Sequence, residues 1–368
     1  MGNILPAALM NTTPPDAPER AWVDIDLAAL TRNARRVASV SGARLLPMVK
    51  ANGYGLGAVA VACALEPLDP WGYGVASPAE GRELRSAGIE RPVLVCTPCS
   101  PSWIPGMLRD RLTPVLADLD AVRAWRGQAG ERPFHVGIET GMARGGFGLD
   151  DRDACSALRQ LVAGSAGYEG ICTHFHSADE QPDTIALQWR EFQQVVDAVG
   201  RPPLVHAANS AGALRSRDVA GDLVRPGIFL YGGIAGDQMP ETVARFRSRV
   251  VAVEDIRAGQ TVSYGATWRA SVPTRIAVVA AGYADGWHRS GSSRSVVELR
   301  GRRVPVRGRI TMDMTMVEAP DDTALDDVVT IFGGLVSLDE QAALAGTISY
   351  ELLTSLSPRV ERRYGEAT

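Results

Sequence analysis

Lysine is almost absent from this chain. The 368 residues contain 38 lysine and arginine side chains together, and Lys50 is the only lysine among them. Arginine supplies surface charge and pairs with carboxylates, but its guanidinium stays protonated, whereas a lysine amine can lose its proton and form an imine with an aldehyde. Lys50 is therefore the first candidate for covalent chemistry.

Blocks of like charge, long apolar runs and regularly spaced cysteines are also missing. The chain balances 38 basic against 42 acidic residues, a net charge of -4, and has no basic cluster that could neutralise nucleic-acid phosphates. No run of about 18 apolar residues occurs, so no membrane span is expected. The five cysteines are odd in number and irregularly spaced. They favour reduced thiols and a cytoplasmic protein over a disulfide framework.

What is present is an alternation of short apolar runs with helical patterns. A chain of this length exceeds one ordinary hydrophobic core, so two domains are expected. The alternation predicts a (β/α)8 barrel, with a doubly wound sheet as the alternative. Ser77 and Glu80 have the spacing of a capping box, with Pro78 at the first helical position. The candidate strands are 44–50, 73–77, 92–97, 112–117, 134–140, 169–174, 204–209 and 223–230.

The domain boundaries follow from where this alternation stops. After about residue 245 the sequence changes to β-branched runs separated by glycine and polar turns. We expect residues 1–20 to form a flexible tail and residues 21–43 to form a strand that pairs with the second domain, followed by a helix. Residues 44–244 are expected to form the barrel, and residues 245–368 a β-rich domain.

Residues with functional chemistry gather at the predicted strand ends, which is where barrel enzymes place their active sites. Lys50 ends the first strand, where partial desolvation favours the neutral amine, and a glycine-rich segment with Tyr54 follows. Asn209 and Ser210 end the seventh strand, and residues 225–228 lie in the eighth. Loops at these last two positions commonly bind phosphate. An amine beside a phosphate cradle suggests pyridoxal phosphate as cofactor.

An ordered set of motifs resembles the alanine racemase family, the fold-type III amino-acid racemases that use pyridoxal phosphate. The likeness covers about residues 21 to 365 in order and without large gaps. The segments that carry it are VDIDLAALTRNARRV, VKANGYGLG, THFHSADE, HAANSAG, VRPGIFLYG, VSYGATW, GYADGW, GRITMDM and TISYELL.

The resemblance implies a two-base racemisation of a small L-amino acid to its D-enantiomer. Lys50 would bind the cofactor as an internal aldimine and act on one face of the substrate, while Tyr264 would act on the opposite face. In the family the tyrosine comes from the partner subunit, so a homodimer with shared active sites is implied. Arg225 would donate a hydrogen bond to the pyridine nitrogen of the cofactor and suppress competing transamination.

The same resemblance assigns the remaining contacts. The phosphate would be held by Tyr54, Ser210, Gly227 and Ile228, and the ring face would be contacted by His174. The substrate side would be formed by Arg144, the backbone N–H of Met312 and, at the mouth of the site, Tyr283.

Three positions depart from the family pattern. Gly137 stands where these enzymes usually carry a lysine that orients the arginine corresponding to Arg144. His176 replaces a small residue, and Pro358 lies where some members have a phosphate-binding tyrosine. We expect Gly137 and His176 to reshape the substrate side, so that the substrate is alanine or a related, larger amino acid.

Other functions remain open from sequence alone. A decarboxylase or aldolase could use the same barrel and cofactor, but a second proton donor such as Tyr264 favours a racemase. A non-catalytic cofactor carrier would need no second domain. A barrel metallohydrolase is suggested by His174, His176 and Asp179, although no spacing completes a ligand set, and we expect no metal.

Overall fold

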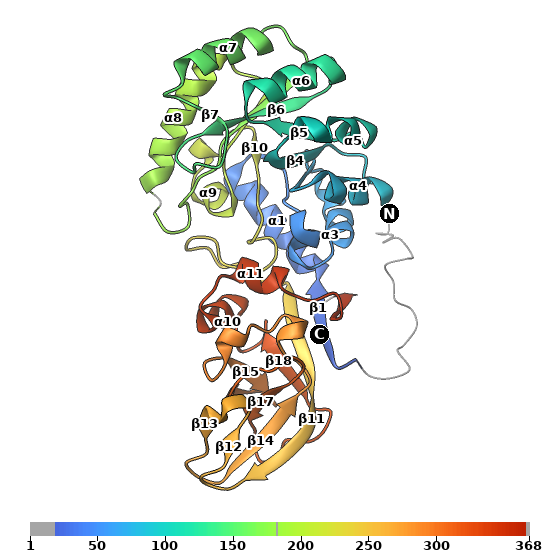
Figure 1. The fold of residues 1–368 in the computed structure, drawn as a ribbon, viewed down its shortest axis with the longest axis vertical. Helices are drawn as coiled ribbons and strands as arrows, with labels where there is room; N and C mark the ends of the chain where they lie inside the picture. The colour runs from blue at the N-terminus through green and yellow to red at the C-terminus, as the bar shows by residue number, and fades with distance from the viewer. Residues whose placement is uncertain (1–18, 182, 366–368) are drawn as a thin grey trace.

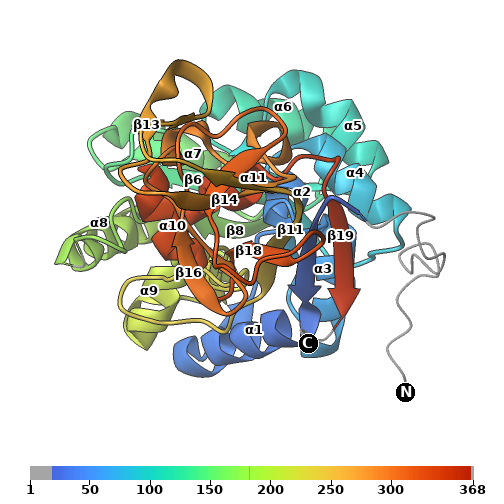
Figure 2. The same ribbon diagram turned by 90° about the horizontal axis from the view of Figure 1, so that it is seen from below.

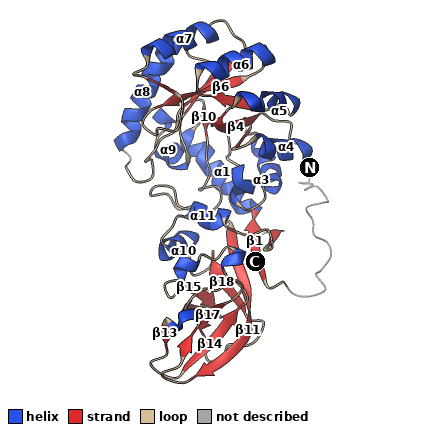
Figure 3. Ribbon diagram, in the orientation of Figure 1, coloured by secondary structure: helices blue, strands red, loops and turns tan. Residues whose placement is uncertain are grey.

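The computed structural model describes residues 19–181 and 183–365. Most of the expected tail, residues 1–18, lies outside this range. Helices surround a set of strands in the upper part of the molecule, and strands predominate in the lower part, as the two colourings show (Figures 1 and 3). Seen from below, the lower strands lie across the base of the helical part (Figure 2).

The upper part is an eight-stranded parallel barrel, which confirms the predicted fold class. Six strands pair in one sheet in the order β3-β4-β5-β6-β8-β9, and β10 pairs with β2. The strands are β2 (Arg44–Leu45), β3 (Tyr73–Val75), β4 (Val93–Pro98), β5 (Thr113–Leu116), β6 (Phe134–Glu139), β8 (Tyr168–Cys172), β9 (Leu204–His206) and β10 (Leu223–Val224), with the short β7 (Phe147–Gly148) beside β6.

Backbone hydrogen bonds beyond the paired strands close the ring. On one side of β10, the amide of Arg225 donates to the carbonyl of Ala208 at 2.8 Å. On the other side, a parallel bridge between Met48 and Gly74 joins the segment after β2 to β3. Because each strand then has two neighbours, every C-terminal strand end faces the same mouth.

Helices cover the outside of the barrel (Figure 3). The predicted capping box is present at α4, where Ser77 Oγ accepts from the amide of Glu80 and the Glu80 carboxylate accepts in return. No described helix is long and apolar enough to cross a membrane. The helices are α1 (Leu27–Ser41), α2 (Lys50–Tyr54), α3 (Ala58–Leu65), α4 (Pro78–Ser86), α5 (Ile104–Arg109), α6 (Leu119–Ala129), α7 (Arg152–Val162), α8 (Asp183–Val199) and α9 (Ser210–Arg215).

The lower part is built on the long strand β11 (Ala244–Ile256), which pairs with β1, β14 and β18. The first described strand, β1 (Ala21–Asp26), therefore lies in the sheet formed by the end of the chain. The remaining elements are β12 (Thr261–Val262), β13 (Trp268–Arg269), β14 (Thr274–Val279), β15 (Val296–Leu299), β16 (Arg302–Pro305), β17 (Thr315–Glu318), β18 (Val328–Phe332), α10 (Leu338–Ala345), α11 (Ser349–Thr354) and β19 (Glu361–Gly365).

Three predicted strands end three or more residues earlier than the sequence suggested. Strands were expected over 44–50, 204–209 and 223–230, but the structure ends them at Leu45, His206 and Val224. Pro47 and Pro226 follow the first and last of these strands and have no N–H to donate to a ladder. The apolar residues beyond these points belong to turns that line the barrel mouth.

The two parts of the molecule press together at glycines near the barrel mouth. A Cβ at Gly55 would lie 2.2 Å from the carbonyl oxygen of Leu353 at the end of α11. A Cβ at Gly57 would lie 2.1 Å from the hydroxyl of Tyr364, which donates to the carbonyl of Leu56 at 3.0 Å. Both glycines have positive φ, 83° and 98°. The segment after Lys50 is thus held by the C-terminal elements of the same chain.

This contact predicts different costs for two glycines of similar conformation. Gly55 and Gly88 have φ of 83° and 86°, but a Cβ at Gly88 meets nothing within 4 Å. Gly88→Ala should lower the free energy of unfolding by about 1 to 2 kcal/mol, the cost of left-handed backbone. Gly55→Ala should lose roughly 1 to 3 kcal/mol more through overpacking against Leu353. Urea unfolding of both variants measures the difference. Equal losses in the free energy of unfolding would contradict the close contact between Gly55 and Leu353.

Candidate active site

A cavity of about 630 Å³ opens at the C-terminal ends of the barrel strands. Barrel strands and loops form most of its wall, and α11 adds Tyr350, Glu351 and Thr354 from the other part of the chain. It brings together these sequence-predicted residues: Lys50, Tyr54, Arg144, His174, Asn209, Ser210, Arg225, Gly227 and Ile228. Residues that come from distant parts of the sequence therefore share one mouth.

Lys50 begins a short turn in which the following residues have a left-handed backbone conformation. The three residues Ala51, Asn52 and Tyr54 have φ of 53°, and Gly53 between them has φ of 59°. Non-glycine residues in this region cost roughly 1 to 2 kcal/mol each. The amide of Ala51 donates to the Glu80 carboxylate at 2.8 Å. The carboxylate that caps α4 thus also fixes the backbone beside the only lysine.

Arg225 is buried, and its guanidinium is surrounded by neutral acceptors. Nη1 lies 2.7 Å from Nδ1 of His206. Nη2 donates to the carbonyls of Thr173 at 2.6 Å and Ala207 at 3.0 Å, and lies 3.1 Å from Nδ1 of His174. Because an arginine keeps its proton, both imidazole nitrogens must act as acceptors. Burial and the Arg225 charge lower the pKa of His174 to about 3.

Neutral hydroxyl and amide groups line the same cavity as this guanidinium. Ser210 Oγ accepts from the Gly227 amide at 2.9 Å. A Cβ at Gly227 would lie 2.2 Å from the hydroxyl of Tyr54, so only glycine allows the phenol and the amide to approach this closely. The Tyr54 ring stacks on Tyr231 with centroids 4.5 Å apart. Burial raises the pKa of Tyr54, which therefore keeps its proton and can donate it to an anion.

Arg144 supplies a second, unpaired positive charge at the cavity. Its backbone amide is held by the Glu139 carboxylate at 2.9 Å. Within the described residues its guanidinium has neither a hydrogen bond nor an ion pair. Gly137 lines the same cavity, and a Cβ there would lie 3.2 Å from Cγ1 of Val115. The chain therefore leaves the Arg144 guanidinium available to an anion.

Three predicted residues lie outside this cavity, in the lower part of the molecule. Tyr264 is 72% exposed, Tyr283 43% and Met312 52%. Tyr264 begins a short 3-10 turn, Tyr264–Ala266, after Ser263, whose φ is 66°. None of these three side chains lines the cavity of its own chain.

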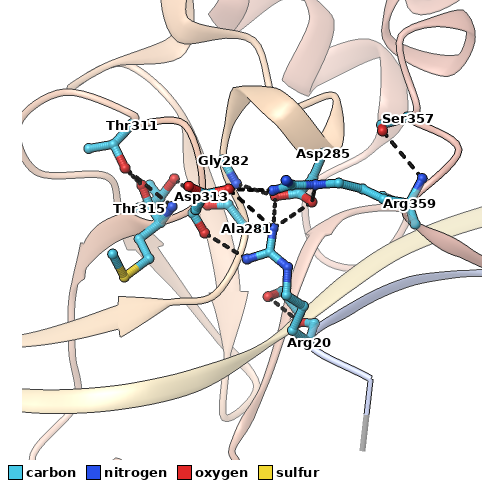
Figure 4. Close-up of polar contacts among 12 residues, drawn as sticks. Arg20, Ala281, Gly282, Asp285, Thr311, Asp313, Thr315, Ser357 and Arg359 are labelled. Carbon is cyan, nitrogen blue, oxygen red and sulfur yellow. Dashed lines mark hydrogen bonds and ion pairs between the residues drawn. The ribbon is translucent and has the colours of Figure 1, made fainter. Parts of the chain in front are cut away.

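A network of charged side chains fixes two of these exposed residues (Figure 4). The buried carboxylate of Asp285 accepts from Arg20 at 2.7 Å, from Arg359 at 2.7 Å and from the Gly282 amide at 2.8 Å. Arg359 also donates to Asp313 at 2.6 Å. The residues next to Tyr283 and Met312 are thus tied to both ends of the described chain, which restricts the positions of the two exposed side chains.

His176 does not join the cavity. Its Nδ1 lies 2.6 Å from Ser177 Oγ, and its ring packs beside Gly141. The expectation that His176 contacts substrate has no support from this placement. Both His174 and His176 lie beyond the end of β8 at Cys172, and the backbone amide of His176 is held by Gln188 of α8 at 3.1 Å. Among the described residues, no group of three histidine, cysteine or acidic side chains is placed to hold a metal ion. The suggested cluster of His174, His176 and Asp179 therefore does not assemble.

Sequence reasoning missed a buried amide that supports the mouth. Gln188 of α8 donates to the carbonyls of Thr140 at 3.0 Å and His174 at 3.2 Å, and accepts from the His176 amide at 3.1 Å. It joins the ends of β6 and β8. A glutamine within an otherwise apolar helix face was the available signal, since such a residue must find partners when buried.

Comparisons with known proteins agree over nearly the whole chain. Residues 25–235 match the family described as alanine racemase, N-terminal domain, and residues 243–364 match alanine racemase, C-terminal domain. An alanine racemase of Symbiobacterium thermophilum is 37% identical over 96% of this chain and 99% of its own length. One of Deinococcus radiodurans is 39% identical over 94% and 99%. The solved alanine racemase of Streptomyces coelicolor has a TM-score of 0.85 at 31% identity, covering 95% of this chain and 98% of its own.

The buried histidines predict a loss of stability in mild acid. The pKa of His135, His174 and His206 is lowered in each case chiefly by burial. Below pH of about 6.5 the unfolded chain binds more protons than the folded chain, so the free energy of unfolding falls as pH falls. A histidine whose pKa in the folded chain lies well below 5.5 contributes about 1.4 kcal/mol per pH unit, so the three together should remove up to about 4 kcal/mol between pH 7.5 and 5.5.

Urea unfolding of the ligand-free chain at these two pH values tests this prediction. His174→Asn should reduce the difference by about one third, because it removes one of the three groups. A free energy of unfolding that is equal at both pH values would contradict it.

Proposed function

The chain belongs to the alanine racemase family, and on this premise we propose that Lys50 and Tyr264 are its two catalytic groups, brought together from two subunits of a homodimer. The protein is a pyridoxal phosphate-dependent racemase that interconverts L- and D-alanine. The observation that carries the assignment of roles is the placement of the only lysine in the barrel cavity, together with Tyr54, Ser210 and Arg225, whose chemistry suits parts of this cofactor.

The residues of the cavity fit pyridoxal phosphate by their chemistry. Lys50 offers an amine to the aldehyde, and Arg225 offers a fixed donor to the ring nitrogen. The hydroxyls of Tyr54 and Ser210 and the close backbone of Gly227 suit a phosphate. The missing tyrosine at position 358 leaves these donors in place. When bound, the cofactor withdraws electron density from the substrate α-carbon and so makes its proton removable.

The proposed roles of the chain's own residues divide between two faces of the substrate. Lys50 Nζ takes or returns a proton on one face, and Tyr264 Oη does so on the other. Arg225, a permanent cation, disfavours a proton on the ring nitrogen and so limits side reactions. His174, with its pKa lowered to about 3, stays neutral beside Arg225. Arg144 binds the substrate carboxylate with its unpaired guanidinium.

A homodimer is supported by the incompleteness of the single chain. Tyr264, Tyr283 and Met312 are exposed and lie away from the cavity of their own chain. A second copy of the lower part would supply the phenol, with Tyr283 and Met312 beside it. We also place the protein in the cytoplasm, which the free state of the five cysteines supports.

Single and mixed variants test the two catalytic roles and the shared site. Lys50→Ala should lose both racemisation and the visible absorbance of the bound cofactor, whereas Tyr264→Phe should lose racemisation and keep that absorbance. A mixed dimer that contains one subunit of each variant has one intact site out of two. Mixing equal amounts should therefore restore about a quarter of wild-type activity.

Chiral chromatography of alanine and absorbance spectra give these readouts, and borohydride reduction followed by peptide mapping locates the attached cofactor. Attachment to a residue other than Lys50 would refute the proposal. Mixed variants that stay inactive after verified subunit exchange would refute the shared site.

We further propose that the substrate side accepts side chains larger than a methyl group. Gly137 adds no side chain to the wall, and the neighbouring Ala117 is small. We expect 2-aminobutyrate and serine to be racemised with kcat/KM within about a hundred-fold of alanine. Ala117→Val should lower kcat/KM for 2-aminobutyrate more than for alanine. The proposal fails if larger substrates are not racemised, or if this variant affects both substrates equally.

A further inference from the structure

The contact between Arg225 and His206 continues deeper into the barrel. Nε2 of His206 lies 2.8 Å from Nδ1 of His135, and Nε2 of His135 lies 3.4 Å from Oε2 of Glu169. The four residues come from the segment after β10, from β9, from β6 and from the start of β8. They form an unbroken line from the cavity toward the opposite end of the barrel, which we call the histidine relay (Arg225, His206, His135 and Glu169).

The hydrogen positions along the relay follow from its two ends. Arg225 can only donate, so Nδ1 of His206 must accept and its Nε2 must carry the hydrogen. That hydrogen can be donated only to Nδ1 of His135, whose own hydrogen then lies on Nε2 and points at Glu169. An arginine at one end and a carboxylate at the other therefore impose a single direction on three successive bonds.

Burial of the two imidazole rings makes the loss of any of these hydrogen bonds costly in free energy. His135 and His206 are 0% exposed, whereas the Glu169 side chain is 30% exposed. A buried apolar cluster, whose members are Leu46, Trp71, Leu94, Val115 and Leu223, meets the relay at Trp71. Trp71 packs on His135 with ring centroids 5.4 Å apart. Apolar side chains at positions 135 and 206 would fill the same space without hydrogen-bond partners, whereas buried imidazoles need such partners.

The relay also connects the charge of the buried Arg225 to a carboxylate. All of the hydrogen-bond acceptors that directly contact this buried guanidinium, among the described residues, are neutral carbonyls and imidazole nitrogens. Glu169 is the carboxylate that the relay reaches. Because each bond polarises the next in a low-dielectric interior, the negative charge of Glu169 strengthens His206 as an acceptor.

We propose that His135 and Glu169 are positioning residues that hold Arg225 in the orientation and charge environment in which it meets the cofactor ring. This inference rests on the proposed role of Arg225 in the cofactor site. The relay fixes the tautomer of His206, and His206 in turn fixes the guanidinium. Neither His135 nor Glu169 lines the cavity, so both act on the reaction only through Arg225.

Kinetics and spectra of the loaded enzyme test the proposal with matched variants. Glu169→Gln removes the charge and keeps the shape, and His135→Phe removes the bond to His206. Glu131→Gln is the control, because Glu131 lies near the same end of the barrel and accepts from the Gly167 amide at 3.0 Å outside the relay. His135→Phe should lower kcat about ten-fold. Glu169→Gln should lower it by a smaller factor, with KM for alanine within about two-fold.

The cofactor absorbance supplies a readout that loss of packing alone would not move. We expect the visible band of His135→Phe and Glu169→Gln to shift in position or in its pH dependence, while Glu131→Gln keeps the wild-type spectrum. Nitrogen-15 spectra of the histidines in the full-length protein give a second readout that needs no turnover. Wild type should show His206 and His135 neutral with the hydrogen on Nε2.

These measurements separate the relay from the proposed function. Wild-type spectra and kcat in both relay variants, or a hydrogen on Nδ1 of His206, would overturn the relay while leaving racemisation intact. If wild type failed to racemise alanine, the proposed function would fail, and the tautomers would still decide whether the relay exists. If His135→Phe does not fold, Glu169→Gln and the wild-type tautomers decide the question.

Discussion

A permanently charged guanidinium enclosed at the end of a barrel is the constraint on which this site depends. Arg225 cannot release its proton, so every donor that it buries must face an acceptor. The carbonyls of Thr173 and Ala207 and the rings of His174 and His206 meet that demand. Burial and this charge together lower the pKa of His174 and keep its ring neutral.

The lysine side of the site depends on a different kind of constraint, the close approach of backbones. The left-handed turn after Lys50 is costly in isolation, and it persists because it is held from two directions. Glu80 binds its first amide from inside the barrel part, while Leu353 and Tyr364 pack on Gly55 and Gly57 from the C-terminal elements. The lower part of the molecule thus stabilises the turn that follows Lys50 in its own chain.

The same lower part exposes Tyr264, Tyr283 and Met312, which do not line the cavity of their own chain. Asp285, Arg20 and Arg359 hold the segments that carry Tyr283 and Met312 in a fixed and exposed position. Rigid exposure of this kind suits a surface that completes a site on another copy, because little conformational freedom remains to be lost on association. In the proposed function, assembly of two subunits is therefore a condition for catalysis.

The sequence by itself determined the barrel and the grouping of Lys50, Asn209, Ser210 and Arg225 at its strand ends, whereas Arg144 and His174 came from the family resemblance. The reason is that apolar periodicity marks each strand and a parallel barrel sends all strand ends to the same mouth. Only the tertiary structure decided that β2 and β10 end before Pro47 and Pro226, that His176 does not line the cavity, and that His135 and Glu169 continue the contacts of Arg225. Those outcomes depend on distances between side chains of different strands, which closure of the barrel sets and local sequence does not encode.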